Sequence, residues 1–447
     1  MGIYHFIAIG GIGMSGLAKY LLEDGHTVSG SDIADSKYIK ALRDLGANVT
    51  IGHKTENVPD NAIVVVSTAI RENNPELIRA KELGLKIYHR SDMLKEIAEQ
   101  AQAGGKCFIG FSGTHGKTTT SGLCSYVLDK TGLEPSFVDG GIVPELHTNA
   151  QHKKGKYFVA ELDESDGTIV KYNPDILVIN NLEEDHLDFY KNGMSDIVKT
   201  FNTAISHSKK VIVNNDNSGV KLLSGNFVTY GLNDADYVAK NIEYSREGTI
   251  FDIYKKDELL TSIKIQLSGV HNVYNTLAVV SALTESGVDI NKVKDYFYGF
   301  TGMGRRFQKV CELDGIEVYD DYAHHPTEIK ATLNAASIKF GKEHIVAVFQ
   351  PHRYTRLKAL WNEFKHAFDE AGRIIVTDVY AASEDKIEGI TGEHFASDLR
   401  GAEYLSGDMR EVAKKLLPSL KKGDIVIGLG AGTITALGKE LESLELV

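Results

Sequence analysis

The segment "FIGFSGTHGKTTTSG" at residues 108–122 constrains the fold of this chain more than any other feature. An apolar stretch followed by a glycine-rich turn, Gly-Lys-Thr and a helix is typical of a phosphate-binding loop on a parallel α/β sheet. The usual spacing requires glycine at position 111, where this chain has Phe111, and the glycines are Gly110 and Gly113 instead. The loop is therefore either a chance match or a phosphate loop of a variant kind, and its flanking strand and helix favour the variant loop.

A second glycine-rich turn, "GGIGMSG", lies near the N-terminus. Gly11, Gly13 and Gly16 form the G-x-G-x-x-G fingerprint between a predicted strand and a predicted helix, and Asp32 follows at the expected distance. Such a turn places a diphosphate on backbone N–H groups at a helix N-terminus. The pattern does not distinguish NAD from a UDP-linked sugar, so an NAD-dependent oxidoreductase remains one interpretation.

The rest of the chain alternates buried strands with helices, which predicts an α/β fold with parallel sheets. Its 447 residues are enough for about three domains of ~150 residues each. Small polar residues at 99–106 and the glycine-rich segment 299–306 indicate the boundaries, and residues 226–268 predict short strands in an antiparallel patch. The predicted domains are a Rossmann-like domain at 1–104, a central ATPase-like domain with a phosphate loop at 105–302, and a second Rossmann-like domain at 303–447.

Charge and composition exclude several classes of partner. A net charge of −12 argues against general nucleic-acid binding, and an anionic substrate must be held by local donors. Cys107, Cys124 and Cys311 form neither a disulfide framework nor a metal-binding pattern. No apolar stretch approaches the ~20 residues of a membrane span. We therefore expect a cytoplasmic protein that binds no nucleic acid and no membrane.

A phosphate loop that uses Mg²⁺ needs carboxylates at the ends of neighbouring strands. Glu161 directly follows the predicted strand in "YFVAELDESD" and is the best candidate ligand. Asp163, Glu164 and Asp166 are expected to be solvated loop charges. The next acidic strand end, "NNLEEDHLDFY", contains His186, for which metal binding and a structural role are equally good interpretations.

Two phosphate sites in one chain restrict the function. A dehydrogenase needs no ATP loop, and a simple nucleotide hydrolase needs no dinucleotide-type domain. An enzyme that uses ATP to activate a second, nucleotide-linked substrate needs both. A nucleotide-sensing protein without catalytic activity would be favoured by loss of Lys117, Glu161 or His324, and the chain has all three.

Six motifs together resemble the Mur ligase family, whose members build the peptide of bacterial cell-wall precursors. They span essentially the whole chain in the family's order: "GTHGKTTT", "ELDESD", "LEEDHLD", "SGVHNVYN", "DDYAHHPTE" and "QPHRYTR". The shortened glycine spacing of the loop is itself a feature of this family. Within it, the chain is most similar to the member that joins L-alanine to the lactyl carboxylate of UDP-N-acetylmuramate. The alternative is the member that attaches a recycled tripeptide to the same sugar nucleotide.

The resemblance implies an ATP-dependent, amide-forming ligase that uses Mg²⁺ and an acyl-phosphate intermediate, as a monomer or weak homodimer. It implies ATP binding by Gly113, Thr114, His115, Gly116, Lys117, Thr118, Thr119, His271, Asn272, Asn275, Arg305, Arg306 and Asp321. It implies UDP-sugar binding by Gly11, Gly13, Gly16, Asp32 and Ser67. It implies amino-acid binding by Tyr322, His324, Arg353 and Arg356, and metal binding by Thr118, Glu161 and His186.

Three of these residues are the expected catalytic groups. Lys117 would neutralise charge on the transferred phosphoryl group. His324 would accept or orient the proton of the attacking amine, or serve only as a hydrogen-bonding scaffold. Arg353, with Arg356, would bind the carboxylate of the incoming amino acid. The resemblance does not identify a carbamoylated lysine.

Overall fold

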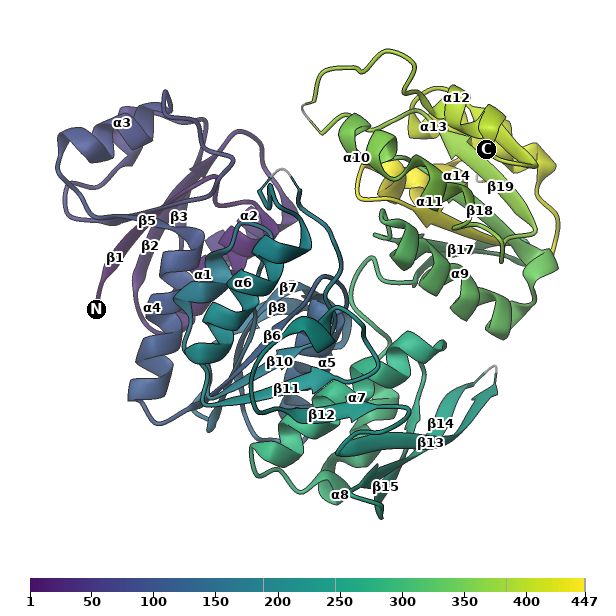
Figure 1. Ribbon diagram of the computed structural model, residues 1–447. Coiled ribbons are helices and arrows are strands. Elements are labelled where there is room, and N and C mark those ends of the chain that lie inside the picture. The colour runs from purple at the N-terminus through teal and green to yellow at the C-terminus, as the bar shows by residue number, and fades with distance from the viewer. Residues whose placement is uncertain (188, 246, 383, 446–447) are drawn as a thin grey trace. The chain divides into compact units, whose positions relative to one another are not determined.

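The computed structural model describes residues 1–187, 189–245, 247–382 and 384–445, and the strands in these ranges form three sheets (Figure 1). The three sheets confirm the predicted α/β architecture. The described chain divides into two compact units. The first unit comprises Met1–Lys240, Asp252–Ile263 and Tyr274–Phe300, and the second comprises Asn241–Phe251, Lys264–Val273 and Thr301–Val447.

The N-terminal sheet is parallel and has the strand order of a Rossmann-like domain. Its strands are β1 (Ile3–Ile7), β2 (Thr27–Asp32), β3 (Asn48–Ile51), β4 (Ile63–Val66) and β5 (Ile87–His89), and its helices are α1 (Ile12–Glu23), α2 (Lys37–Asp44), α3 (Pro75–Glu82) and α4 (Arg90–Ala103). The order is β3-β2-β1-β4-β5. Buried residues of α1, α2 and α4 pack in one cluster and those of α3 in another, so helices cover both faces.

The central sheet carries the phosphate loop. Its strands are β6 (Cys107–Ser112), β7 (Ser136–Val143), β8 (Thr148–Gln151), β9 (Tyr157–Glu161), β10 (Ile176–Ile179), β11 (Lys210–Asn214), β12 (Val228–Gly231), β13 (Tyr237–Ser245), β14 (Gly248–Lys255) and β15 (Glu258–Ile265). Its helices are α5 (Lys117–Lys130), α6 (Met194–Ser206), α7 (Val270–Glu285) and α8 (Ile290–Val293). The order is β15-β14-β13-β12-β11-β10-β6-β9-β7-β8. Because β6 lies between its parallel neighbours β9 and β10, the loops that follow these strands share one edge of the sheet.

The predicted strands at 226–268 are present as β12 to β15. Residues 256 and 257 connect β14 to its neighbour β15. A two-residue connection joins only antiparallel strands, so the predicted antiparallel patch is present at β14 and β15. Strand β12 instead pairs parallel with β13, so the prediction was wrong there.

The N-terminal sheet and the central sheet share a hydrophobic core, which explains why the N-terminal sheet and most of the central sheet belong to the first unit. Helix α1 packs against β7 and β8 of the central sheet. The Asn149 side chain donates to the Ile12 carbonyl at 2.7 Å, and Arg90 forms a 2.6 Å ion pair with Asp163. The elements that carry the two glycine-rich turns are therefore fixed against each other.

The boundary predicted from the small polar residues at 99–106 coincides with the end of a helix and the turn that follows it. Helix α4 continues through Ala103 because Ala98 and Ala101 extend its buried face. A turn at 104–106 then leads directly into β6. The two domain boundaries themselves stay predictions.

The C-terminal sheet lies in the second unit and is parallel except at one edge. Its strands are β16 (Gln308–Leu313), β17 (Ile316–Asp321), β18 (Ile345–Phe349), β19 (Arg373–Thr377), β20 (Ala402–Leu405) and β21 (Ile425–Leu429), and its helices are α9 (Pro326–Phe340), α10 (Tyr354–Ala359), α11 (Trp361–Lys365), α12 (Gly392–Asp398), α13 (Met409–Leu416) and α14 (Leu437–Glu445). The order is β16-β17-β21-β18-β19-β20, with β16 antiparallel to β17. Helices α9 to α12 pack in one hydrophobic cluster, and α13 and α14 pack in another.

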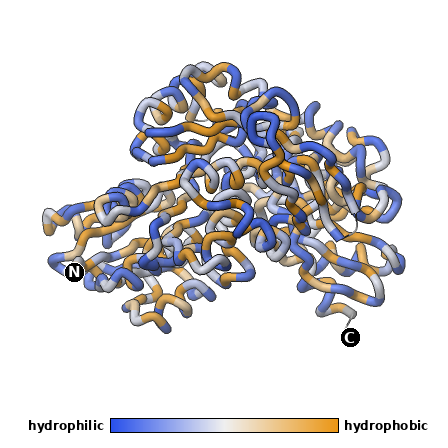
Figure 2. Tube along the Cα trace, turned by 90° about the horizontal axis from the view of Figure 1, so that it is seen from below, coloured by the Kyte–Doolittle hydropathy of each residue, from blue (hydrophilic) through white to orange (hydrophobic). Residues whose placement is uncertain are grey.

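Hydrophobic stretches alternate with hydrophilic segments along the whole chain (Figure 2). Strands β18 and β21 of the C-terminal sheet are buried along their full length. None of the described helices has the length and apolar character that a membrane span requires.

Candidate functional site

The phosphate loop joins β6 to α5, and two glycines in the left-handed region shape it. Gly113 has φ 124° and Gly116 has φ 83°. A Cβ atom on Gly113 would lie 2.8 Å from the Asn181 carbonyl oxygen. The Asn181 side chain accepts from the His115 backbone N–H at 2.8 Å and donates to the His115 carbonyl at 3.1 Å. Asn181 therefore holds the loop from the end of the neighbouring strand β10, a role that sequence analysis missed.

Lys117 is held by acceptors within and beside the loop. Its Nζ donates to the carbonyls of Gly113 and Thr114 at 2.7 and 3.1 Å, and to Glu164 Oε1 at 2.9 Å. Glu164 is only 3% exposed, so the prediction that it is a solvated loop charge was wrong. A buried ammonium needs an anionic partner, which Glu164 provides.

The electrostatics of this pair are set by burial. Burial raises the pKa of Glu164 to about 7, although Lys117 opposes the rise. Burial lowers the pKa of Lys117, but Glu164 and Glu161 outweigh it and the net direction is upward. Lys117 therefore keeps its charge at neutral pH.

The other acids after β9 differ in environment. Glu161 ends β9, and its Oε2 accepts from the Gly140 backbone N–H at 3.1 Å. Asp163 pairs with Arg90, and although burial opposes it, the positive charges of Lys117 and Arg90 lower the pKa of Asp163 to about 2. The prediction of a solvated Asp163 was therefore also wrong.

Asp166 has a local role in the loop after β9. Its Oδ1 accepts from the backbone N–H and the hydroxyl of Thr168 at 3.2 and 2.6 Å. These bonds hold the turn that follows the acidic segment, and Asp166 stays partly exposed, as expected.

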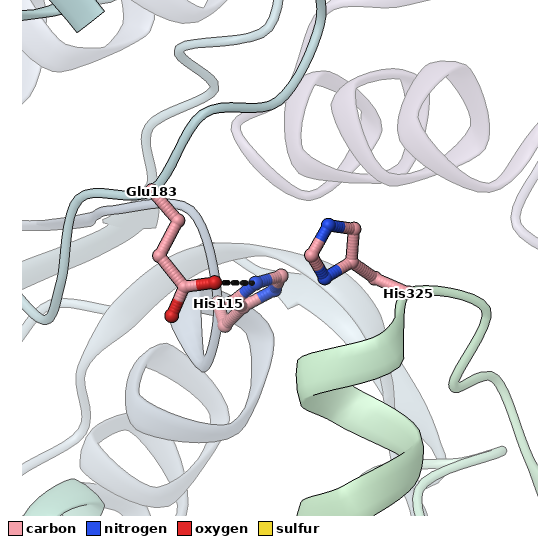
Figure 3. A group of neighbouring side chains, drawn as sticks. All are labelled: His115, Glu183 and His325. Carbon is pink, nitrogen blue, oxygen red and sulfur yellow. Dashed lines mark ion pairs between the residues drawn. The ribbon is translucent and has the colours of Figure 1, made fainter. Parts of the chain in front are cut away.

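The loop after β10 brings a second set of residues to the same edge of the sheet. His115 Nε2 lies 3.4 Å from Glu183 Oε2, an ion pair drawn in Figure 3. His186 follows with φ 53° and lines a small pocket together with Thr114 and Glu164. The structure therefore brings the phosphate loop, Glu164 and His186 together, as the carboxyl ends of parallel strands require.

The N-terminal glycine turn is fixed at one side and open at the other. Asp32 Oδ2 accepts from the Gly10 backbone N–H at 2.9 Å and ties the turn to the end of β2. A Cβ atom on Gly16 would lie 2.7 Å from the Asn149 amide nitrogen, so close packing requires glycine there. A Cβ atom on Gly13 would have no other atom within 4 Å, which leaves room for a ligand beside the start of α1.

Ser67 lies in the turn after β4, at the carboxyl end of the same sheet. Its carbonyl accepts from the Ile70 backbone N–H at 3.1 Å. This placement agrees with the edge of the sheet at which ligands of Rossmann-like domains bind.

The second unit carries a cluster of arginines around Tyr322. The guanidinium groups of Arg305 and Arg306 lie 4.9 and 5.4 Å from the centre of the Tyr322 ring. Arg305 Nε pairs with Asp320 at 3.0 Å, and Arg306 pairs with Glu328 at 3.4 Å. Each guanidinium group beside the end of β17 is therefore paired with a carboxylate.

Asp321, at the end of β17, holds the backbone on both sides of this cluster. Its carboxylate oxygens accept from the N–H groups of Phe307 and Ala323 at 2.7 Å each. Burial raises the pKa of Asp321 to about 6, against the opposing effect of Arg306. The predicted contact of Asp321 with an ATP ribose stays a prediction.

The ring of His324 is oriented by its backbone neighbours. Its Nδ1 lies 2.9 Å from the Tyr322 carbonyl oxygen, which can only accept, so Nδ1 carries a proton. Burial lowers the pKa of His324 below its ordinary value, although Glu328 opposes this. The neutral ring therefore presents Nε2 as its basic atom.

A second histidine, His352, lies beside His324, with ring centres 5.7 Å apart. It stacks on Tyr380 at 5.5 Å, and its Nδ1 lies 3.3 Å from a nitrogen of Arg356. His352 belongs to the motif "QPHRYTR", but the motif alone indicated no role for it. The two histidines and Arg356 form one compact group in the second unit.

Arg353 is fixed by a partner from a later loop. It has φ 72°, and its backbone N–H donates to the Tyr380 carbonyl at 2.9 Å. Its Nε donates to Glu384 Oε1 at 2.6 Å, and Glu384 also accepts from Thr355. Glu384 was missed because it lies 31 residues away in the sequence and matches no motif.

The predicted adenine-site residues lie at the start of α7. Burial lowers the pKa of His271 to about 4, and Arg306 adds to this effect. The Asn272 amide donates to the Ser268 carbonyl at 2.8 Å. In the first unit, Asn275 Oδ1 lies 2.8 Å from the position of a Cβ on Gly116 and so approaches the phosphate loop.

Known protein families match the chain along most of its length. A model of the Mur ligase family catalytic domain matches residues 3–102, the Mur ligase middle domain matches 111–283, and the Mur ligase glutamate ligase domain matches 305–432. UDP-N-acetylmuramate–L-alanine ligase from Geotalea daltonii is 41% identical over 449 residues, which cover 98% of this chain and 96% of the relative.

Solved structures resemble the whole chain. UDP-N-acetylmuramate–alanine ligase from Thermotoga maritima has a TM-score of 0.85 at 29% identity and covers 100% of this chain and 99% of its own. A murein peptide ligase from Psychrobacter arcticus shares the fold, with a TM-score of 0.73 at 22% identity and coverage of 100% and 99%.

Three α/β sheets, a lysine-bearing phosphate loop and these matches define an ATP-dependent, amide-forming ligase, which confirms the enzyme class predicted from the sequence. The chain belongs to the Mur ligase family.

Proposed function

We propose that this ligase joins L-alanine to the lactyl carboxylate of UDP-N-acetylmuramate and converts ATP to ADP and phosphate. The observation that carries this proposal is the 41% identity, over 98% of the chain, to a ligase named for these substrates. The reaction belongs to the synthesis of peptidoglycan precursors, and we place it in the cytoplasm, where ATP and nucleotide sugars are available.

The residues near the phosphate loop fit a divalent cation. Glu161 and Thr118 offer hard oxygen atoms, and His186 offers an imidazole nitrogen. The buried Oε2 atom of Glu164 has no hydrogen-bond partner in the described part of the structure, so the pocket that His186 also lines has unused acceptor capacity. We assign Thr118, Glu161 and His186 to Mg²⁺, which when bound would neutralise charge on the phosphates of ATP.

The first chemical step uses the phosphate loop. The loop N–H groups that Asn181 does not occupy, such as those of Gly116 and Lys117, donate to phosphate oxygens. The ammonium group of Lys117 stabilises the charge that develops on the γ-phosphoryl group as the lactyl carboxylate attacks it. The attack forms an acyl phosphate and releases ADP.

The second step is assigned to the residues of the second unit. Arg353 and Arg356 bind the carboxylate of L-alanine as guanidinium forks, and Tyr322 is assigned to the same amino-acid site. His324 Nε2 accepts a proton from the amino group, because its Nδ1 already donates to the Tyr322 carbonyl. The amine attacks the acyl carbon, and phosphate leaves with one oxygen of the original carboxylate.

The remaining residues bind the two nucleotides. Gly11, Gly13 and Gly16 hold the pyrophosphate of the UDP-sugar at the start of α1, and Asp32 and Ser67 line the uridine end. ATP contacts beyond Lys117 and Thr118 are assigned to Thr114, His115, Gly116, Thr119, His271, Asn272, Asn275, Arg305, Arg306 and Asp321.

An isotope-transfer experiment tests this proposal. UDP-N-acetylmuramate labelled with ¹⁸O in its lactyl carboxylate is incubated with ATP, Mg²⁺ and L-alanine, and the phosphate is analysed by mass spectrometry. The mechanism predicts one ¹⁸O atom per phosphate released. Unlabelled phosphate accompanying amide formation would contradict the acyl-phosphate route.

A further inference from the structure

Asp139 on β7 is a buried acid whose carboxylate oxygens lack hydrogen-bond donors in the described part of the fold. It is 2% exposed, and neither carboxylate oxygen has a hydrogen-bond partner in the described part of the chain. Burial raises the pKa of Asp139 well above its ordinary value, although Ser121 and Ser125 oppose this. Buried polar atoms almost always have partners, so an orphaned carboxylate requires a specific explanation.

Another buried acid of the same unit shows how a structural carboxylate is normally satisfied. Glu76 is fully buried, and it accepts from His5, from Ser31, from Asn57 and from the backbone N–H of Lys54. Four donors surround this acid, whereas Asp139 has none at hydrogen-bonding geometry. Asp139 is therefore not a structural acid of the ordinary kind.

The position of Asp139 places it beside Glu161. Strands β7 and β9 are parallel, and Val138 pairs with Ala160. Asp139 and Glu161 follow these two residues, so their side chains leave the same face of the sheet. The backbone N–H of Gly140, the residue after Asp139, donates to Glu161 Oε2 at 3.1 Å, so Asp139 and Glu161 are neighbours.

Helix α5 covers this pair of acids with hydroxyl groups. Thr118, Ser121 and Ser125 are spaced by three and four residues and share one face of the helix. Ser121 Oγ donates to the Thr118 carbonyl at 3.3 Å. Ser121 and Ser125 both lower the pKa of Asp139, against the effect of burial. Asp139 thus lies beside Glu161 and near the face of α5 that carries Thr118. Glu161 and Thr118 are the two oxygen donors assigned above to the metal.

We propose that Asp139 belongs to the divalent-cation site as a second acid, beside Glu161, an inference that rests on the proposed function. Two neighbouring carboxylates in a buried setting repel each other, and a divalent cation stabilises both. The orphaned oxygens of Asp139 supply the extra negative charge, either directly or through a metal-bound water. Asp139 therefore raises the affinity of the site for the cation rather than the stability of the fold.

The test is a titration with Mn²⁺ alone, followed by electron paramagnetic resonance, on wild-type protein and four variants. Asp139→Asn keeps the shape of the side chain, and Asp139→Ala removes it without adding a polar group. Glu161→Gln marks the cation site. Asp129→Asn is the matched control, because Asp129 lies on α5 and already accepts from Gln151 at 2.9 Å.

Both Asp139 variants should bind Mn²⁺ about tenfold or more weakly, as loss of a supporting group at a metal site typically causes. Asp129→Asn should bind like wild type. Without metal, Asp139→Asn should melt no lower than wild type, because an amide carries no buried charge. Wild-type Mn²⁺ affinity in both Asp139 variants, with affinity lost in Glu161→Gln, would overturn the inference. Phosphate release by the wild-type enzyme tests the proposed function separately.

Discussion

Replacing Gly113 by alanine should damage the phosphate loop in a way that the structure allows us to estimate. Gly113 has φ 124°, a conformation that costs an L-residue about 1–3 kcal/mol. The new Cβ would also lie 2.8 and 3.0 Å from the backbone oxygen and nitrogen of Asn181. Backbone atoms cannot turn aside as a flexible side chain can, and such overpacking costs about 1–3 kcal/mol more.

Gly132→Ala is the matched control for this prediction. Gly132 follows α5 with φ 73°, and a Cβ there would have no atom within 4 Å. This variant carries only the conformational cost of a left-handed residue, about 1–2 kcal/mol. The difference between the two variants therefore isolates the collision with Asn181.

Two assays separate loop damage from general instability. Urea unfolding should show a loss of about 2–6 kcal/mol for Gly113→Ala, the sum of the two costs, and a smaller loss for Gly132→Ala. Calorimetric titration with ADP should show affinity reduced more than about tenfold in Gly113→Ala and unchanged in Gly132→Ala, since a displacement worth 1.4 kcal/mol already gives tenfold. Equal stability and equal ADP affinity in the two variants would refute the proposed close packing.

Three further predictions concern charged groups. Lys117→Ala should abolish phosphate release yet leave UDP-sugar binding, followed by calorimetry, near normal, and an active variant would exclude Lys117 from phosphoryl transfer. Arg353→Ala should raise the KM for L-alanine more than about tenfold, as loss of a charge-assisted contact does, and leave UDP-sugar affinity unchanged. Glu384→Gln, which loosens Arg353, should raise this KM less. Equal weakening of L-alanine binding and UDP-sugar binding would contradict the prediction. Folding raises the pKa of Glu164 from 4.5 to about 7, so the native state binds more protons between these values and stability falls as pH rises through that window; Glu164→Gln should flatten this dependence in unfolding curves, and an unchanged slope would refute it.

Local patterns were enough to predict the framework of this molecule. The apolar runs before each glycine-rich turn became β1 and β6, and the helices α1 and α5 begin where the turns end. Parallel strands place their following loops at one edge, so the approach of the phosphate loop to the loops that follow β9 and β10, which carry Glu164 and His186, was implied by the alternation of strands and helices. Strands, turns and helices could be predicted from the sequence because they depend on residues that are neighbours along the chain.

The errors and omissions concern pairs that only tertiary structure creates. Asp163 is not a solvated charge because Arg90, from the N-terminal domain, reaches it. Glu384 holds Arg353 from a loop that carries no motif. Asp139 looks like an ordinary strand residue until the pairing of β7 with β9 places it beside Glu161. The sequence shows which residue types are present, but partners from distant segments decide their charge state.

The continuation of α4 through Ala103 shows the same limit on a smaller scale. The small polar residues at 99–106 indicate a domain boundary but not where the helix before it ends, which depends on the burial of Ala98 and Ala101. Packing against the sheet outweighs the weak local preference of such a segment.

Phosphate release from ATP, measured with Mg²⁺ and UDP-N-acetylmuramate, tests the central claim most directly. The protein is supplied with L-alanine, with the recycled tripeptide, or with no amine. We predict that phosphate is released with L-alanine, and that none is released with the tripeptide or without an amine. Release with the tripeptide alone would contradict the proposed substrate and assign the chain to recycling.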